Sequence, residues 1–566
     1  MQVSYGMLQR RRAGYFFTLV ALVFIALAGR LAFVQFVRGP ELRERALEVR
    51  LRDVPVEARR GTIYDRQGRE LAVSIDVDSV FAVPSQVRDR EATAAALAEA
   101  LDLAPDWVAE RLGRETAFVW IKRKISAEQA ATVRAAKLRG VKLTQESKRV
   151  YPKGTLACHL IGFAGIDSQG LEGIEYQYDS HLKGVPGWVS SEYDARGQEI
   201  PQAVHRYLEP RDGLSLVLTI DETIQYISER ELEQAVVERG AKGGCILVMD
   251  PQTGEILALA NYPYYDPNNY QAYDVANRRN GAVCDTYSPG STFKPVTAAA
   301  ALEEGVVSWD DHFFCGGSLQ LPGARVRCWK DGGHGSLSML GVIENSCNVG
   351  FMNIAQRLGI EKFYDYVEAF GLTSKTNLDL PGEANGLIVP RAKAKSLDLG
   401  VMSFGQSLTV TPIQLLRATA AIANGGTLLQ PHIVKELRTS EGVVVESFAS
   451  DTRREVISAQ TARELSAALE STVENGTGRR AFIPGFELAG KTGTAQKVVD
   501  GRVSSELHIS SFVGFGPASD PRVVALVVID EPTGAIYGGQ VAAPIFGTLM
   551  NDIYRYLGIP VTAPEG

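Results

Sequence analysis

Ser291 and Lys294 have the residue types and the spacing of a nucleophile and its base. The segment Ser291-Thr292-Phe293-Lys294 follows a Ser288-Pro289-Gly290 turn, and we expect a helix over 292–302. Side chains three residues apart on a helix share one face. A serine hydroxyl is a weak nucleophile until a base removes its proton, and a lysine shielded from water near another cation can have its pKa lowered enough to serve. Because many solvent-exposed helix faces carry a serine and a lysine at this spacing, the pair alone does not identify a catalytic site.

Two further motifs make an accidental match a poor explanation. Ser346-Cys347-Asn348 lies inside a predicted helix over 343–358, and Lys491-Thr492-Gly493-Thr494 lies on a predicted strand over 487–497. The glycine permits a substrate backbone to approach the strand closely. Lys491 and the two threonine hydroxyls offer a cation and donors to a substrate carboxylate. The three motifs in this order predict a site of nucleophilic catalysis by a serine.

Three cysteines and one histidine accompany these motifs. Cys315, Cys328, His334 and Cys347 are separated by 12, 5 and 12 residues. Three thiols and an imidazole suit tetrahedral zinc, although no C-x-x-C pair is present. A disulfide that joins Cys328 to Cys347 or to Cys315 is an alternative if this part of the chain lies in an oxidising compartment outside the cell membrane. A bond to Cys347 would couple activity to redox state. Buried free thiols that pack as small apolar groups are the third alternative.

The surrounding elements predict an α+β catalytic domain. We expect strands over 214–220, 245–250 and 255–260 near its beginning, with a helix over 222–238 between the first two. We expect three antiparallel strands over 487–497, 509–515 and 522–529 near its end, and a helix over 412–423 in the middle. Strands at both ends around a helical middle imply a sheet that closes from distant segments.

The composition is that of a globular protein with one membrane segment. The 566 residues carry 59 Lys+Arg against 66 Asp+Glu, a net charge of −7, with 45% apolar and 22% charged residues. These figures exclude a disordered, collagen-like or polytopic chain, and without a long basic face we expect no nucleic-acid partner.

Arg10, Arg11 and Arg12 precede an apolar stretch over 13–37, long enough to cross a bilayer. The basic cluster predicts a cytoplasmic N-terminus and an extracytoplasmic catalytic domain. A cleaved signal peptide and a buried soluble helix are the alternatives. Arg30 within the stretch suggests either snorkelling to the interface or a partner helix in the membrane.

Four regions follow from these patterns. Residues 1–38 form a cytoplasmic tail and anchor, 39–205 a spacer or docking region of mixed strands with helical residues near 90–113, 206–557 the catalytic domain and 558–566 a tail. A charged helix over 41–53 leads out of the membrane.

Together the motifs resemble the class B penicillin-binding proteins, and more the division and sporulation type than the elongation type. The resemblance rests on the three site motifs and on these segments: Arg60-Gly61-Thr62-Ile63 with Asp65-Arg66 and Gly68, Arg149-Val150-Tyr151-Pro152, Gly170-Leu171-Glu172-Gly173-Ile174-Glu175, Thr219-Ile220-Asp221 with Gln225, Asp250-Pro251 with Thr253-Gly254-Glu255, and Phe404-Gly405-Gln406 with Thr411-Pro412. It implies an α+β penicillin-binding transpeptidase domain, with an antiparallel sheet flanked by helices, behind a mixed α/β pedestal (dimerisation-type) domain and one transmembrane helix.

The resemblance also implies an activity and residue roles. A D,D-transpeptidase cross-links peptidoglycan stem peptides in septal or spore wall synthesis. Ser291 would carry the acyl group, Lys294 would be the base, and Ser346 would pass the proton to the leaving amine. Asn348 would hold the amide of the donor peptide. Lys491 would position Ser346 and the substrate carboxylate, and Thr492 and Thr494 would bind that carboxylate. The backbone N–H groups of Ser291 and Thr494 would form the oxyanion hole.

The implied ligands and partners follow from the same resemblance. β-Lactams would acylate Ser291, and catalysis would require no cofactor, leaving zinc as a structural possibility. No segment suggests a glycosyltransferase, so a polytopic membrane glycosyltransferase and division or sporulation proteins are the expected partners. A catalytically silent penicillin-binding scaffold is the alternative function.

Overall fold

The computed structural model describes residues 3–192, 206–450, 453–499 and 502–560. These residues divide into two compact units, Met1–Ala58 with Val185–Asp212 and Arg59–Gly184 with Gly213–Gly566. The predicted boundary at 205 and most of the predicted tail over 558–566 lie outside the described residues. The four predicted regions therefore stay a prediction.

The first unit contains the predicted anchor. Its elements are α1 (Val3–Ala32), η1 (Phe33–Val37), α2 (Gly39–Arg50), β1 (Leu51–Val56), β6 (Gly187–Glu192) and β7 (Arg206–Leu208). The three strands form an antiparallel sheet in the order β1-β6-β7. Leu8–Val37 is the one helical segment among the described residues that is long and apolar enough to cross a membrane. It contains the predicted span over 13–37 and fits a single-pass membrane protein.

The N-terminal part of the second unit consists of helices and of four strands that belong to a larger sheet. Its elements are β2 (Ile63–Tyr64), β3 (Glu70–Ala82), β4 (Val119–Lys122), β5 (Val141–Val150), α3 (Arg90–Leu101), α4 (Pro105–Leu112), α5 (Ala127–Ala136), α6 (Cys158–Ile161), α7 (Gly173–Gln177) and α8 (Asp179–Leu182). Asp89 caps α3 by accepting a hydrogen bond from the backbone of Ala92. Helices α3 and α4 confirm the predicted helical stretch near 90–113.

A seven-stranded sheet joins this part to the rest of the unit. The order is β17-β16-β8-β2-β3-β4, with β5 on β3, and it brings in β8 (Ser215–Leu218), β16 (Val434–Arg438) and β17 (Val444–Ser447). Strands β2 and β8 are parallel, whereas the other pairs are antiparallel.

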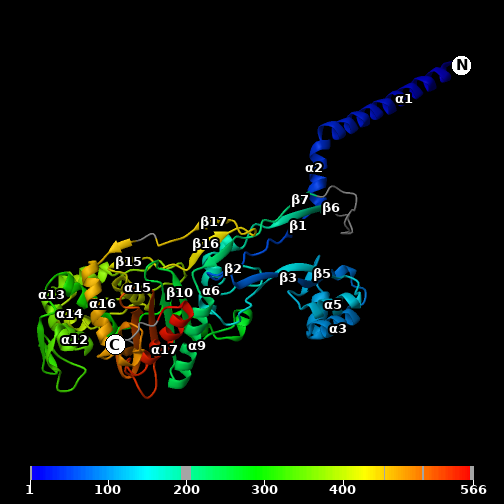
Figure 1. Cartoon of the computed structure of the whole chain (residues 1–566). Coiled ribbons are helices and arrows are strands. Elements are labelled where there is room, and N and C mark those ends of the chain that lie inside the picture. Colours follow the sequence, from blue (N-terminus) through cyan, green and yellow to red (C-terminus); the bar gives the residue numbers. More distant parts are fainter. Residues whose placement is uncertain (1–2, 193–205, 451–452, 500–501, 561–566) are drawn as a thin grey trace. The chain divides into compact units, whose positions relative to one another are not determined.

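The central sheet of the second unit closes from distant segments, as predicted. Its order is β10-β9-β21-β20-β19, all antiparallel, with β9 (Gly243–Met249), β10 (Ile256–Tyr262), β19 (Ala489–Val499), β20 (Arg502–Gly516) and β21 (Val523–Asp530). Helices α9 (Glu222–Arg239) and α17 (Ala542–Leu557) pack against each other and against this sheet, and Figure 1 shows both beside β10.

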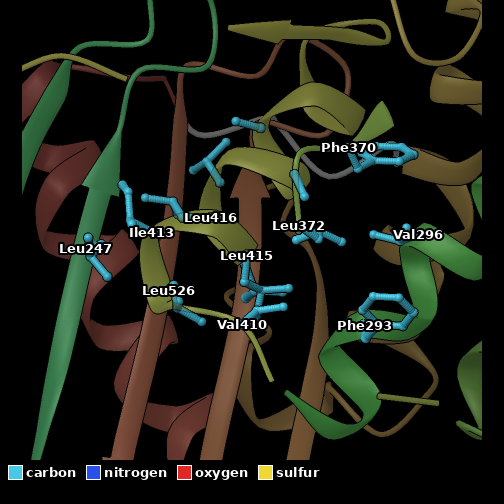
Figure 2. Packing of buried hydrophobic residues seen from close by; sticks show 14 of the residues in the cluster. Leu247, Phe293, Val296, Phe370, Leu372, Val410, Ile413, Leu415, Leu416 and Leu526 are labelled. Carbon is cyan, nitrogen blue, oxygen red and sulfur yellow. The ribbon is translucent and has the colours of Figure 1, made fainter. Parts of the chain in front are cut away.

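Alternate residues of the central strands pack into two separate apolar cores, because successive side chains of a strand point to opposite faces. Ile246 and Val248 pack on the side of α9 and α17, and Leu247 and Met249 on the other. On that second side lies α15 (Pro412–Ala423), whose bounds match the predicted helix. Figure 2 shows Leu247 and Leu526 of the sheet packed with Ile413, Leu415 and Leu416 of α15.

In addition to the short 3-10 helices η3 (Pro267–Ala272), η4 (Val275–Arg278) and η6 (Arg391–Lys393), the helical middle carries a further set of elements. They are α10 (Gly281–Cys284), η5 (Gly290–Phe293), α11 (Lys294–Glu303), β11 (His312–Cys315), β12 (Ser318–Leu321), β13 (Ala324–Arg327), β14 (Gly335–Ser338), α12 (Met339–Glu344), α13 (Asn348–Ala369), α14 (Ser396–Met402), β15 (Thr427–Leu429), β18 (Arg453–Glu455), α16 (Ala459–Glu474) and η7 (Arg479–Ala481).

The prediction that Ser346-Cys347-Asn348 lies inside one helix over 343–358 is wrong. Helix α12 ends at Glu344, α13 begins at Asn348, and Ser346 adopts a positive φ of 51°. This left-handed conformation is costly for a residue other than glycine and cannot occur inside an α-helix. The motif is therefore a tight turn between two helices.

Candidate active site

The nucleophile candidate lies in a turn held against the sheet. Ser291 belongs to the 3-10 turn η5, one turn before the regular helix α11. The backbone N–H of Gly290 donates to Gly405 O at 3.0 Å. A Cβ on Gly405, which has a φ of +79°, would lie 2.0 Å from Gly290 O. Only glycine permits that approach, which explains why the Phe404-Gly405-Gln406 motif accompanies the serine motif.

Lys294 is fully buried, and its hydrogen-bond partners among the described residues are all neutral. Its Nζ donates to Ser346 O at 2.6 Å, Ser346 Oγ at 3.0 Å and Asn348 Oδ1 at 2.8 Å. Burial lowers the pKa of Lys294 to about 7, although the nearby Cys347 and Cys328 oppose the shift. The first two motifs thus meet at one ammonium group, which can exist in its neutral form near neutral pH.

The turn that presents Ser346 is fixed from several sides. Cys347 caps α13, with its Sγ accepting from the backbone of Gly350 at 3.4 Å. The indole Nε1 of Trp329 donates to Asn345 O and to Ser346 O, both at 3.1 Å. The Ser346 carbonyl therefore accepts from both Trp329 and Lys294, which anchors the strained turn to the base.

Lys491 lies on β19 and is also buried. Its Nζ lies 3.4 Å from Thr477 Oγ1 and 3.5 Å from Thr492 Oγ1. Burial first, and then the neighbouring Lys294, hold the pKa of Lys491 well below its ordinary value. A bound anion would raise the pKa of Lys491 toward its ordinary value, because a nearby opposite charge favours the protonated ammonium form.

Thr477 was missed by the sequence reasoning. It follows α16 in the segment Asn475-Gly476-Thr477-Gly478, and its hydroxyl accepts from Thr492 Oγ1 at 3.2 Å. A Cβ on Gly476 would lie 2.6 Å from Glu344 O, so the chain there packs directly on the end of α12. The two glycines that flank Thr477 in the sequence were the available signal, because glycines often mark a segment that packs closely against another backbone.

The motif residues converge on one cleft of about 1190 Å³. Those that line it are Ser291, Ser346, Asn348, Thr492 and Thr494, together with Thr477. Lys294 and Lys491 lie buried behind this lining. Gly493 lies under the nucleophile turn, because a Cβ there would be 2.8 Å from Thr292 Cγ2 and 2.9 Å from Pro289 O.

Cations dominate the charged residues around the cleft. The exposed basic side chains that line it are Arg325, Arg327, Lys330, Arg479 and Arg480, against the carboxylate of Asp331. In a chain with a net charge of −7, this local excess of positive charge favours an anionic ligand.

Cys315, Cys328, His334 and Cys347 also come together. One ligand atom from each lies within 4.8 Å of the others, and the three cysteines are buried. Cys158 and Cys245 are buried elsewhere, and Cys284 is half-buried.

The three pedestal motifs meet at Glu175, which is fully buried. Glu175 pairs with Arg60 at 2.5 Å and with Arg149 at 2.6 Å, and Tyr151 donates to it at 3.2 Å. Burial alone would raise the pKa of Glu175, but Arg149 and Arg60 hold it below the ordinary value. This network has no cleft residue, and its arrangement indicates a structural role.

Comparisons with known proteins agree with this architecture. Residues 244–551 match the penicillin binding protein transpeptidase domain, and 55–218 match the penicillin-binding protein dimerisation domain. Stage V sporulation protein D of Bacillus subtilis is 42% identical over 97% of this chain and 86% of its own. Peptidoglycan D,D-transpeptidase FtsI of Escherichia coli is 35% identical over 96% of this chain and 90% of its own. A crystal structure of penicillin binding protein 3 from Mycobacterium tuberculosis, complexed with aztreonam, has a TM-score of 0.70 and 28% identity, and the match covers 90% of this chain and 99% of that one.

The fold and the three converging motifs define a penicillin-recognising domain with an N-terminal extension. The chain belongs to the class B penicillin-binding proteins.

Proposed function

We propose that this protein is a peptidoglycan D,D-transpeptidase that cross-links stem peptides through an acyl-enzyme on Ser291. The names of the FtsI and stage V sporulation relatives support this activity and a place in division or spore wall synthesis. The observation that carries the proposal is the buried Lys294, hydrogen-bonded to both Ser346 and Asn348 behind the cleft that Ser291 lines.

Ser291 Oγ attacks the carbonyl carbon of the penultimate D-Ala, and its proton passes to neutral Lys294. Ser346 relays a proton to the leaving amine, so the peptide bond breaks, terminal D-Ala departs and an ester to Ser291 remains. An amine of a neighbouring stem peptide then attacks the ester carbonyl and passes its proton to neutral Lys294. A new peptide bond forms as the ester bond breaks, and Ser291 Oγ takes the proton back. A pKa of about 7 for Lys294 supports its role as base, because an ordinary lysine is almost fully protonated at neutral pH.

The donor peptide lies along β19. Thr492 and Thr494 bind its terminal carboxylate, and Lys491 supplies the compensating charge at the back of the cleft. The backbone N–H groups of Ser291 and Thr494 stabilise the oxyanion, and Asn348 binds the donor amide. Because penicillin presents a carboxylate and a strained amide in the same relation, it acylates the same serine. The aztreonam complex of the mycobacterial relative supports β-lactam binding at this fold.

The basic Arg10-Arg11-Arg12 cluster supports a cytoplasmic N-terminus, with the catalytic domain on the outer side of the membrane. Strand polymerisation is then the task of a polytopic membrane glycosyltransferase within a division or sporulation complex. Arg30, at the membrane segment's outer half, is the residue through which a partner helix would contact the anchor.

A fluorescent penicillin tests the nucleophile and separates an enzyme from a silent scaffold. We expect one covalent adduct per chain on the peptide that carries Ser291, none in Ser291→Ala, and full labelling in the matched control Ser288→Ala. Incubation with a D-Ala-D-Ala pentapeptide and an acceptor amine should then release D-Ala in equal amount to cross-linked product. Wild-type protein that forms no covalent penicillin adduct on Ser291, or that releases no D-Ala, would support the catalytically silent scaffold instead.

A further inference from the structure

We propose that Cys315, Cys328, His334 and Cys347 bind a zinc ion that stabilises the Ser346 turn. These four side chains come from the ends of separate elements: β11 ends at Cys315, Cys328 follows β13, His334 precedes β14 and Cys347 precedes α13. Their ligand atoms nevertheless lie within 4.8 Å of one another.

Two of the separations among these atoms are close to those of a tetrahedral zinc site. With Zn–S bonds near 2.3 Å and a Zn–N bond near 2.05 Å, tetrahedral angles place two sulfurs about 3.8 Å apart and a sulfur and a nitrogen about 3.6 Å apart. Cys328 Sγ lies 4.0 Å from Cys347 Sγ and 3.6 Å from His334 Nδ1. A disulfide would require about 2.05 Å between the sulfurs.

The backbone brings the ligands together before any ion binds. His334 N donates to Cys315 O at 3.1 Å, and Cys328 N donates to Gly317 O at 2.8 Å. Gly333 has a φ of +81°, and a Cβ there would lie 2.2 Å from Cys315 O. These two hydrogen bonds and the close approach of Gly333 to Cys315 hold the loops that carry the ligands.

The ligand set selects zinc and a structural role. Three sulfurs with one imidazole fill a tetrahedral coordination sphere and leave no position for water. The cysteines are exposed by only 1%, 7% and 0% for Cys315, Cys328 and Cys347, respectively. The ion would therefore hold protein segments together and would not touch substrate.

The held segment is the one that presents Ser346 and Asn348. Cys347 is the middle residue of that motif, and Trp329, next to Cys328, donates to Ser346 O. An ion that fixes Cys328 and Cys347 therefore fixes two sides of a turn whose φ of +51° is unfavourable by itself. Loss of the ion should relax the turn and move Ser346 away from Lys294.

Metal content is the direct test, and it does not depend on catalysis. The full chain in detergent micelles is loaded with zinc, desalted and measured by elemental analysis. We expect about one zinc per chain in the wild type and in the matched control Cys284→Ser, and a loss of at least fivefold in Cys328→Ser and His334→Asn. Fewer than 0.1 zinc per wild-type chain, whether the thiols are then found reactive or joined in a disulfide, would overturn the proposal.

Cobalt provides a measurement that needs no variant. Co²⁺ bound in place of zinc should give tetrahedral visible bands and a thiolate charge-transfer band, and added zinc should abolish both. An octahedral spectrum would refute the site. Chelation should also slow penicillin acylation by roughly tenfold to a hundredfold, since small displacements of catalytic groups have effects of this size. Removal of bound zinc with no change in acylation would refute the link to the Ser346 turn.

Discussion

The pH dependence of acylation is the sharpest test of Lys294 as the base. Only the neutral amine can accept the Ser291 proton, so the acylation rate should follow the deprotonated fraction of Lys294. Burial lowers its pKa from 10.5 to about 7. The second-order rate constant should therefore rise tenfold per pH unit in acid, bend near pH 7 and level off above it.

The size of the effect follows from that pKa. At pH 7 about half of the Lys294 side chains are neutral, whereas an unperturbed lysine would be neutral in about 3 of 10,000 molecules. Burial thus supplies roughly a 1,500-fold gain in competent enzyme at neutral pH. Between pH 5 and pH 8 the neutral fraction rises from about 1% to about 90%, which predicts a roughly 90-fold increase in rate.

Stopped-flow acylation by a fluorescent penicillin over pH 5 to 9 measures this profile. Lys294→Arg is the matched control, because arginine keeps the length and charge but stays protonated, and it should lose about 10²–10⁴ in rate at every pH. Circular dichroism at each pH would confirm that the fold is unchanged. A flat profile, a midpoint near the ordinary lysine value, or normal acylation by the arginine variant would refute the reasoning.

Three further perturbations test the site and its support. Ser346→Ala should lower acylation by about 10²–10⁴ without altering the circular dichroism spectrum, because the proton relay is lost; an unchanged rate would remove Ser346 from the mechanism. Gly493→Ala should lower acylation by roughly 10²-fold, because its Cβ would lie 2.8 Å from Thr292 Cγ2 and 2.9 Å from Pro289 O and would push β19 from the nucleophile turn; wild-type kinetics would contradict the close packing. Glu175→Gln should lower the free energy of unfolding by about 3–5 kcal/mol, because two arginines lose their buried partner. Glu172→Gln is the matched control, because it breaks a partly exposed ion pair in which the carboxylate lies 3.7 Å from Arg278, and it should lower the free energy of unfolding by less than about 1 kcal/mol. Equal losses for the two variants in urea titrations would show that the Glu175 network is no stronger than a surface pair.

Sequence patterns predicted the elements of the central sheet because each strand carries a local signal. Strands β19, β20 and β21 and helix α15 lie where their apolar patterns place them. Thr411 and Gln414 cap α15 reciprocally, and Pro412 stands at its first turn, so this helix start was visible in the sequence. The antiparallel pairing of early and late strands followed from their distribution around the helical middle.

The Ser346 turn could not be predicted in the same way. The apolar pattern over 343–358 continues through it, and neither glycine nor proline marks the break. The turn is imposed by tertiary contacts, namely the bonds of Lys294 and Trp329 to the Ser346 carbonyl. Thr477 was missed for a related reason, since its role comes from the neighbouring Lys491 and Thr492, which lie on another element.

Two fully buried charged groups show why burial by itself does not decide reactivity. Glu175 is surrounded by arginines, and these hold its pKa below the ordinary value, so it stays charged and structural. Lys294 is equally buried, but its hydrogen-bond partners among the described residues are a carbonyl, a hydroxyl and an amide. With no carboxylate bonded to it, desolvation prevails and the amine can shed its proton near neutral pH. The S-x-x-K spacing places this lysine one helical turn after the serine, whereas the neutral partners contributed by the S-x-N turn allow it to act as a base.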